Sequence, residues 1–163
     1  MEAKKMTIVL FSGELDRALA SFILATTAAS MGMEVTMFFT FWGLNVLKKN
    51  EGPAAGRGFM RKMLNRMNRG GTKRLKMSKF HMFGLGTGMM KTLMREANQP
   101  GIDELMSMAK SMGVKFIACT TSCGVMGIDV KNPVAFRTEL VDSYAGAATY
   151  LGKATDAQVN LFI

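Results

Sequence analysis

Two cysteines stand close together in the C-terminal half of the chain, and their thiols could act as nucleophiles. Cys119 ends the apolar run 114–119, and Cys123 comes four residues later in the polar, glycine-rich stretch 120–127. Helix N-termini and nearby cations stabilise a thiolate and lower a cysteine pKa from about 8.5 to roughly 3.5–7.5. Free cysteine is also a common buried hydrophobe, so position alone leaves a reactive and a structural Cys119 equally open.

The residues around the two cysteines match none of the common motifs for redox, metal, hydrolytic or nucleotide sites. Their spacing does not match the Cys-x-x-Cys redox pattern, although a helical turn or a strained disulfide would bring the sulfurs together. His81 is the sole histidine, and it lies in the irregular stretch 80–83, so the sequence favours neither a zinc site nor a hydrolytic triad. The glycine-rich stretch 84–88 follows no apolar strand and matches no nucleotide-binding pattern. We therefore expect no metal and no other cofactor.

The elements that must position these groups alternate between strand and helix. Short apolar runs predict buried strands at 6–11, 34–41, 114–119 and 158–163. Composition and periodicity predict helices at 17–31, 44–49, 102–112 and 145–154. The first two strands and the helix between them make a βαβ unit. The whole alternation predicts an α/β fold with a mainly parallel sheet and helices on both faces.

Candidate binding residues follow three of the predicted strands. In open parallel sheets, ligands bind beyond the carboxyl ends of the strands, where loops and helix N-termini converge. The residues expected there are Ser12 and Gly13 after the first strand, Thr40 and Trp42 after the second, and Ser122 and Gly124 after Cys119. We expect these residues to surround a site at this edge of the sheet.

The net charge of +9 is concentrated in one segment. Residues 55–95 contain eleven lysines and arginines and no acidic residue, whereas the remainder has ten cations and twelve acids. This methionine-rich segment is irregular or helical, and we expect it to form an insertion at about 52–98 in a single domain that spans 1–163. It could be a solvated charged face, or it could bind an acidic partner protein or a membrane surface. Nucleic acid is not favoured, because few aromatic residues accompany the cations and no binding motif is present.

The beginning of the chain lacks the charged, apolar and small-residue regions of a signal peptide. The most apolar region, 18–44, is interrupted by Gly32 and Glu34, so we interpret it as a helix and a strand rather than a membrane span. Two cysteines without an export signal indicate a reducing compartment. We therefore expect a cytoplasmic protein with free thiols.

Four stretches distributed over nearly the whole chain are distinctive, at 8–18, 38–44, 82–90 and 117–128. The last begins Ile117-Ala118-Cys119-Thr120-Thr121-Ser122-Cys123-Gly124. Together these stretches resemble the DsrE/DsrF/DsrH-like sulfur-relay proteins, in particular their larger DsrE-like branch. In the cysteine loop of that family, the cysteine directly after the strand carries sulfur, and Cys119 matches it.

The resemblance implies a flavodoxin-like fold and a sulfur relay in which Cys119 carries sulfane sulfur as a persulfide. Thiolate attack on sulfane sulfur needs thiolate character and access, but no metal or nucleotide. Backbone N–H groups of Ser122, Cys123 and Gly124 would stabilise the anion. The implied partners are sulfur donors and acceptors, either proteins or small thiols. The frequent oligomers of the family also imply a homo-oligomer that buries the methionine-rich segment between subunits.

Two other functions stay open, as does the choice between an enzyme and a carrier subunit. Cys119 and Cys123 would form a redox couple in a thiol redox protein, or the basic segment would act in a non-enzymatic binding module. The family loop usually carries methionine at the position of Cys123. Cys123 would therefore either resolve a persulfide or replace one apolar sulfur side chain with another.

Overall fold

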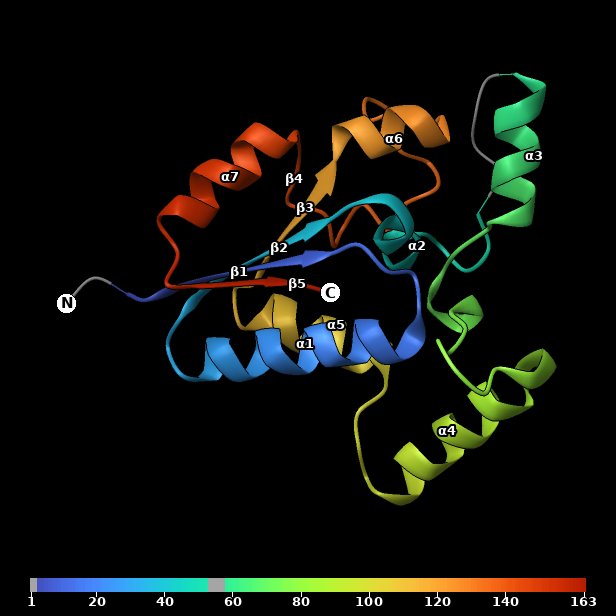
Figure 1. Ribbon diagram of the computed structural model, residues 1–163, viewed down its shortest axis with the longest axis horizontal. Coiled ribbons are helices and arrows are strands. Elements are labelled where there is room, and N and C mark those ends of the chain that lie inside the picture. Colours follow the sequence, from blue (N-terminus) through green and yellow to red (C-terminus); the bar gives the residue numbers. More distant parts are fainter. Residues whose placement is uncertain (1–2, 53–57) are drawn as a thin grey trace.

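The computed structural model describes residues 3–52 and 58–163, which form a five-stranded sheet flanked by helices (Figure 1). The strands are β1 (Lys5–Leu10), β2 (Glu34–Phe39), β3 (Lys115–Cys119), β4 (Ser143–Ala145) and β5 (Val159–Phe162). They lie in the order β4-β3-β2-β1-β5, and all four neighbouring pairs are parallel. The expected α/β class is confirmed. Residues 53–57, at the beginning of the expected insertion, lie outside the described residues.

Helices lie on both faces of the sheet, as expected (Figure 1). α1 (Leu15–Ser30) and α5 (Ile102–Ser111) cover one face, and α7 (Ala147–Thr155) lies on the other. At the carboxyl edge, α6 (Thr120–Met126) continues directly from β3. The short 3-10 turn η1 (Phe41–Gly43) and α2 (Leu44–Leu47) follow β2 at the same edge.

The core is thicker on one face of the sheet than on the other. The larger cluster lies against α1 and α5 and includes the contacting rings of Phe22, Phe39 and Phe116. The smaller cluster lies on the α7 face and consists of Val9, Phe38, Ile117 and Cys119, with Ala145 and Tyr150 packed against them. α7 itself has no fully buried residue. The α7 face is therefore covered by only a thin apolar layer.

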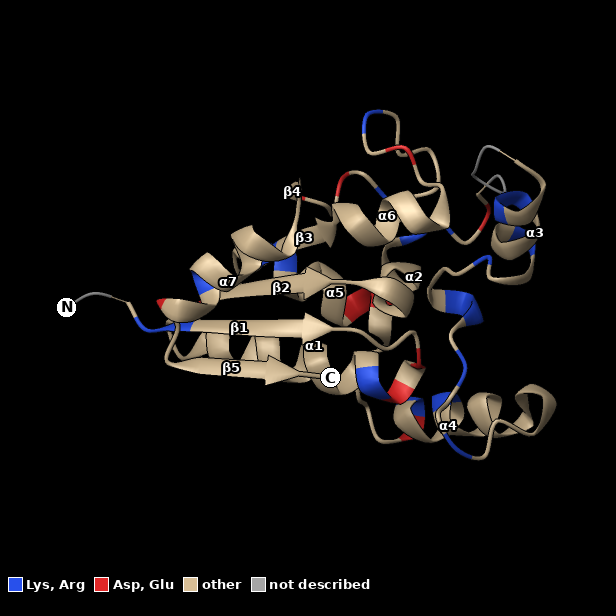
Figure 2. Ribbon diagram, turned by 45° about the horizontal axis from the view of Figure 1, so that its top comes forward, with Lys and Arg blue, Asp and Glu red and all other residues tan. Residues whose placement is uncertain are grey.

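The basic segment lies beyond the carboxyl ends of the strands (Figure 1). Its described elements are α3 (Phe59–Met67), the 3-10 turns η2 (Thr72–Arg74) and η3 (Met82–Gly84), and α4 (Leu85–Glu96). Figure 2 shows lysine and arginine on α3 and along the connection between α3 and α4. Among the described residues, no helix combines the length and apolar content that crossing a membrane requires.

Three elements were not assigned from the sequence. Residues 120–126 form helix α6, which the sequence left open, because a short helix that directly follows a strand shows no apolar periodicity. α4 is helical from Leu85 onward, within the segment that was expected to be irregular or helical. β4 was missed, since three residues are too few for a strand pattern.

Candidate functional site

Cys119 is the last residue of β3, and strand alternation determines the direction of its side chain. Phe116 and Ala118 belong to the larger core, whereas Ile117 and Cys119 belong to the cluster on the α7 face. The Cys119 side chain is 5% exposed. Cys119 therefore lies at the carboxyl end of the thin apolar layer, as its sequence position predicted, with little direct access from solvent.

Two hydroxyl groups from different elements meet beside Cys119. Thr40 directly follows β2, Ser122 lies in the first turn of α6, and their hydroxyl oxygens are 2.8 Å apart. Burial alone would raise the pKa of Cys119, but hydrogen-bond donors oppose it. They are the backbone N–H of Ser122, the hydroxyl pair of Ser122 and Thr40, and the backbone N–H of Thr121. Because the two hydroxyls also hydrogen-bond each other, one of their two protons is shared within the pair. The balance lowers the pKa of Cys119 below that of an ordinary thiol, so more of it is thiolate at neutral pH.

Cys123 lies in a different environment. Its side chain is fully buried in the larger core, and both cysteines are free rather than joined in a disulfide. Burial and repulsion from negative charge on Cys119 raise the pKa of Cys123 to about 12, although Lys48 opposes this. Cys123 is therefore a neutral thiol at ordinary pH, and it packs as a small apolar side chain.

Lys48 is a buried cation near Cys123 that the sequence analysis did not single out. It is 3% exposed, and its Nζ donates a hydrogen bond to the backbone oxygen of Asn68 at 3.1 Å. Burial lowers the pKa of Lys48 to about 8, although negative charge on Cys123 acts in the opposite direction. Its neighbour Lys49 is exposed, and two consecutive lysines gave no reason to expect that one is buried.

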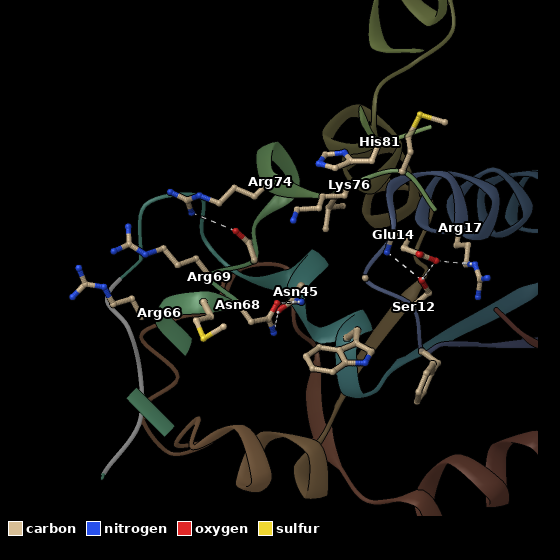
Figure 3. Close-up of a pocket in the computed structure, with 17 residues that line it drawn as sticks. Ser12, Glu14, Arg17, Asn45, Arg66, Asn68, Arg69, Arg74, Lys76 and His81 are labelled. Carbon is tan, nitrogen blue, oxygen red and sulfur yellow. Dashed lines mark hydrogen bonds and ion pairs between the residues drawn. The ribbon is translucent and has the colours of Figure 1, made fainter. Parts of the chain in front are cut away.

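The structure divides the predicted binding residues between two places. Thr40 and Ser122 lie beside Cys119, whereas Ser12, Gly13 and Trp42 line a separate cavity of about 740 Å³ (Figure 3). Neither cysteine is among the described residues that line this cavity.

Of the backbone N–H groups expected to stabilise the Cys119 anion, that of Ser122 lowers the pKa of Cys119, whereas those of Cys123 and Gly124 are not among the causes. The backbone N–H of Thr121, which was not expected, also lowers it. In residues 3–52 and 58–163, no group of three or more His, Cys, Asp or Glu side chains could hold a metal ion.

Comparison with known proteins relates the whole chain to one family. A family model described as DsrE/DsrF/DrsH-like matches residues 2–162. A relative from Bacillus subtilis (strain 168), named uncharacterized protein YrkE, is 41% identical over 164 residues, which cover 99% of this chain and 98% of the relative. A relative from Allochromatium vinosum, named sulfur carrier protein DsrE2, is 34% identical over 173 residues, which cover 100% of both chains.

A solved structure has the same fold. The crystal structure of the ychN protein from E. coli has a TM-score of 0.56 and 10% sequence identity, and the match covers 99% of this chain and 100% of that one. The family model and the relatives confirm the family that the sequence resembled, and the solved structure confirms its fold.

The rate of Cys119 alkylation by iodoacetamide tests its environment. We expect a pH–rate midpoint below that of free cysteine, and no reaction in Cys119→Ser at neutral pH, because Cys123 is buried and protonated. Ser122→Ala and Thr40→Val each remove a donor, and a hydrogen bond to a charged group contributes about 1.5–3 kcal/mol, so the rate at neutral pH should fall about tenfold. Thr121→Ala is the matched control, because it keeps the backbone N–H. Unchanged midpoints in Ser122→Ala and Thr40→Val would contradict this assignment.

The pH dependence of unfolding tests the burial of Lys48. Its pKa is about 8 in the folded protein against an ordinary value of 10.5, so between these values the unfolded chain binds more protons than the folded one. From about pH 8 to 10.5, the free energy of unfolding of wild type, measured in urea, should rise by up to about 1.4 kcal/mol per pH unit relative to that of Lys48→Met. Below pH 8 the difference should be constant. The exposed neighbour provides the control, Lys49→Met. If the difference in free energy of unfolding between wild type and Lys48→Met does not change with pH, the pKa of Lys48 is not lowered.

Proposed function

The chain belongs to the DsrE/DsrF/DrsH-like family, and from this premise we propose that it is a sulfur-relay protein that carries sulfane sulfur as a persulfide on Cys119. The observation that carries the proposal is the position of Cys119 at the carboxyl edge of the sheet, beside the hydroxyls of Thr40 and Ser122. These groups and the nearby backbone N–H groups act to lower the pKa of Cys119, which supports a thiolate at this position. The name of the Allochromatium vinosum relative, a sulfur carrier protein, supports the same class of function.

The proposed transfer is a pair of displacements at sulfur. The Cys119 thiolate attacks the outer sulfur of a donor persulfide, R–S–SH, so that a new S–S bond forms as the donor S–S bond breaks and RS⁻ leaves. An acceptor thiolate then attacks the outer sulfur of the Cys119 persulfide, and the Cys119 thiolate is the leaving group. Each displacement breaks one S–S bond as it forms another, so neither step requires an oxidant or a reductant. The outer sulfur keeps its proton throughout. The donors around Cys119 favour both steps, because they stabilise the anion that attacks first and leaves second.

The environment of Cys123 favours the carrier over the redox alternative. A redox couple requires Cys123 to attack Cys119 as a thiolate, but its thiol is fully buried with a pKa of about 12. In the proposed carrier, Cys123 fills the core where the family usually has methionine. The proposed partners are donor and acceptor proteins or small thiols in the cytoplasm, and a homo-oligomer remains a prediction from the resemblance.

Intact-mass measurement after exposure to polysulfide tests the carrier. We expect wild type to gain the mass of one sulfur atom and to lose it on treatment with cyanide, because cyanide removes sulfane sulfur. Cys123→Ala should load as wild type does, and Cys119→Ser should not load. Sulfur that persists on Cys119→Ser, or loading that fails in Cys123→Ala while Cys119 still alkylates normally, would contradict a Cys119 carrier.

The orientation of α3 favours a second function, contact with an anionic membrane surface. Asn65 lies on the polar face of α3, is buried, and donates a hydrogen bond from Nδ2 to the backbone oxygen of Met126 at 2.7 Å. Phe59 and Met67, on the opposite apolar face, are 82% and 81% exposed. An amphipathic helix whose apolar face is exposed to solvent can bury that face in the apolar layer of a membrane.

The charge of the basic segment favours an anionic membrane surface as that partner. Residues 55–95 carry eleven cations and no acid, so two copies of this surface would repel each other if they met face to face. Anionic lipid headgroups would instead attract the cations, while the acyl chains cover the apolar face of α3. We infer that α3 lies in the interface of an anionic membrane.

Co-sedimentation with vesicles tests this second function. We expect binding to vesicles that contain about one third anionic lipid, weak binding to zwitterionic vesicles, and weakening by salt. Met67→Ser should reduce binding severalfold, whereas Leu151→Ser, a change at an exposed apolar residue of α7, should not. Equal binding to both vesicle types, or a dimer in solution that Met67→Ser dissociates, would contradict the inference.

A further inference from the structure

The cavity beside Trp42 has the size and position of a ligand site, although neither cysteine lines it. It lies where the loop after β1, helix α2 and the segment 66–77 meet (Figure 3). Its volume of about 740 Å³ falls within the range of roughly 300–1,000 Å³ that small-molecule sites occupy. The carboxyl edge of a parallel sheet is also where ligands of such folds bind.

The charges that line the cavity are unbalanced. Five arginine and lysine side chains line it, together with one carboxylate, Glu14. That carboxylate is already engaged, because Arg17 lies 3.0 Å from it and the Ser12 hydroxyl donates to it at 3.0 Å. The side chains of Arg66, Arg69 and Lys76 form no hydrogen bond or ion pair with any other described residue. Cations gathered without a counter-charge repel one another, and a bound anion would offset that repulsion.

Hydrogen bonds attach one wall of the cavity to α2. Asn45 and Asn68 pair through both of their side-chain amides, at 2.7 and 3.2 Å. The Nζ of Lys48 donates a hydrogen bond to the backbone oxygen of Asn68 at 3.1 Å, and the backbone N–H of Gly71 donates to the backbone oxygen of Asn45 at 2.8 Å. Gly70 has a φ of +65°, and a Cβ at this position would lie 2.7 Å from Cδ of Lys48. The wall that carries Arg66 and Arg69 is therefore held closely against the body of the protein.

The opposite wall is attached to the beginning of α1. The backbone N–H of Leu15 donates to the backbone oxygen of Lys76 at 2.7 Å, and the backbone N–H of Ser78 donates to the carboxylate of Asp16 at 3.0 Å. A Cβ on Gly13 would lie 2.7 Å from the backbone oxygen of Trp42, so only glycine allows this loop to approach η1 so closely. Both walls are thus positioned before any ligand binds, which lowers the entropic cost of binding.

Trp42 adds a flat apolar surface to the cationic cavity. It is the sole tryptophan of the chain, it is 44% exposed, and it has no ring contact with another described aromatic residue. Figure 3 shows Arg66, Arg69 and Arg74 extending together at one end of the cavity. The backbone oxygen of Gly70 accepts a hydrogen bond from Arg74 at 3.4 Å, which orients that guanidinium.

We propose that this cavity binds a phosphorylated small molecule that carries a flat ring, the chemical class of nucleotides. Arg66, Arg69 and Lys76 would bind the phosphate groups, since guanidinium groups pair with phosphate oxygens in a bidentate geometry. The ring would lie against Trp42. This site is separate from Cys119, and the proposal does not depend on sulfur transfer.

The fluorescence of Trp42 reports on this cavity alone, because the chain has no other tryptophan. We expect titration with adenosine diphosphate to give a saturable change in emission. Pyrophosphate offers the charge without the ring, and adenosine offers the ring without the charge. Each should bind at least about tenfold more weakly than the diphosphate, because each lacks one of the two contacts. No saturable change with the diphosphate, or equal binding of pyrophosphate, would overturn the proposal.

Charge-matched variants separate the cavity from the general basicity of the segment. Arg66→Gln with Arg69→Gln removes two cations from the cavity, and the single change Lys76→Gln removes a third. Arg61→Gln with Lys62→Gln removes two exposed cations from α3 that do not line it. We expect the double cavity variant to lose at least about tenfold in affinity and the α3 pair less than about twofold. Equal losses in the two pairs, with the melting temperature unchanged, would overturn the proposal. Sulfur loading on Cys119 should be the same in all variants, so the two proposals fail separately.

Discussion

The parallel pairing of β2 with β3 is the constraint on which the candidate site depends. In its register Phe39 lies beside Ala118, so the next residues along the two strands, Thr40 and Cys119, reach the carboxyl edge together. α6 begins at once and brings Ser122 to the same place. A buried thiolate is costly unless hydrogen-bond donors surround it, and these donors come from two elements that the sheet aligns. The hydrogen bonds that lower the pKa of Cys119 thus follow from the register of β2 and β3 and from the start of α6.

Much of this arrangement could be predicted from the sequence, because it rests on apolar runs. The strands β1, β2, β3 and β5, the βαβ unit and the position of Cys119 at a strand end all follow from such runs, whereas β4 is too short to show one. Helix α6 could not be predicted, since its start is set by Cys119 leaving the sheet and not by periodicity. The burial of Lys48 could not be predicted either, because it depends on contact with a loop twenty residues away along the chain.

The carboxyl edge holds two environments with opposite electrostatic character. Cys119 lies in a thin apolar layer under α7, where hydroxyl and amide groups supply the polarity. The cavity beside Trp42 is instead open and cationic, and its walls come from the basic segment. The turn η1 joins the two environments, with Thr40 preceding it at the cysteine and Trp42 within it at the cavity. The sequence grouped both sets of residues into one site, because it could show that they follow strands but not which side of each loop they face.

The most direct test of the account is a crystal structure of the protein after exposure to polysulfide. The account predicts electron density for one additional sulfur bonded to Sγ of Cys119, within hydrogen-bonding reach of the Thr40 and Ser122 hydroxyls, and an unmodified Cys123. A disulfide between the two cysteines, or added sulfur on Cys123 with Cys119 unchanged, would contradict it.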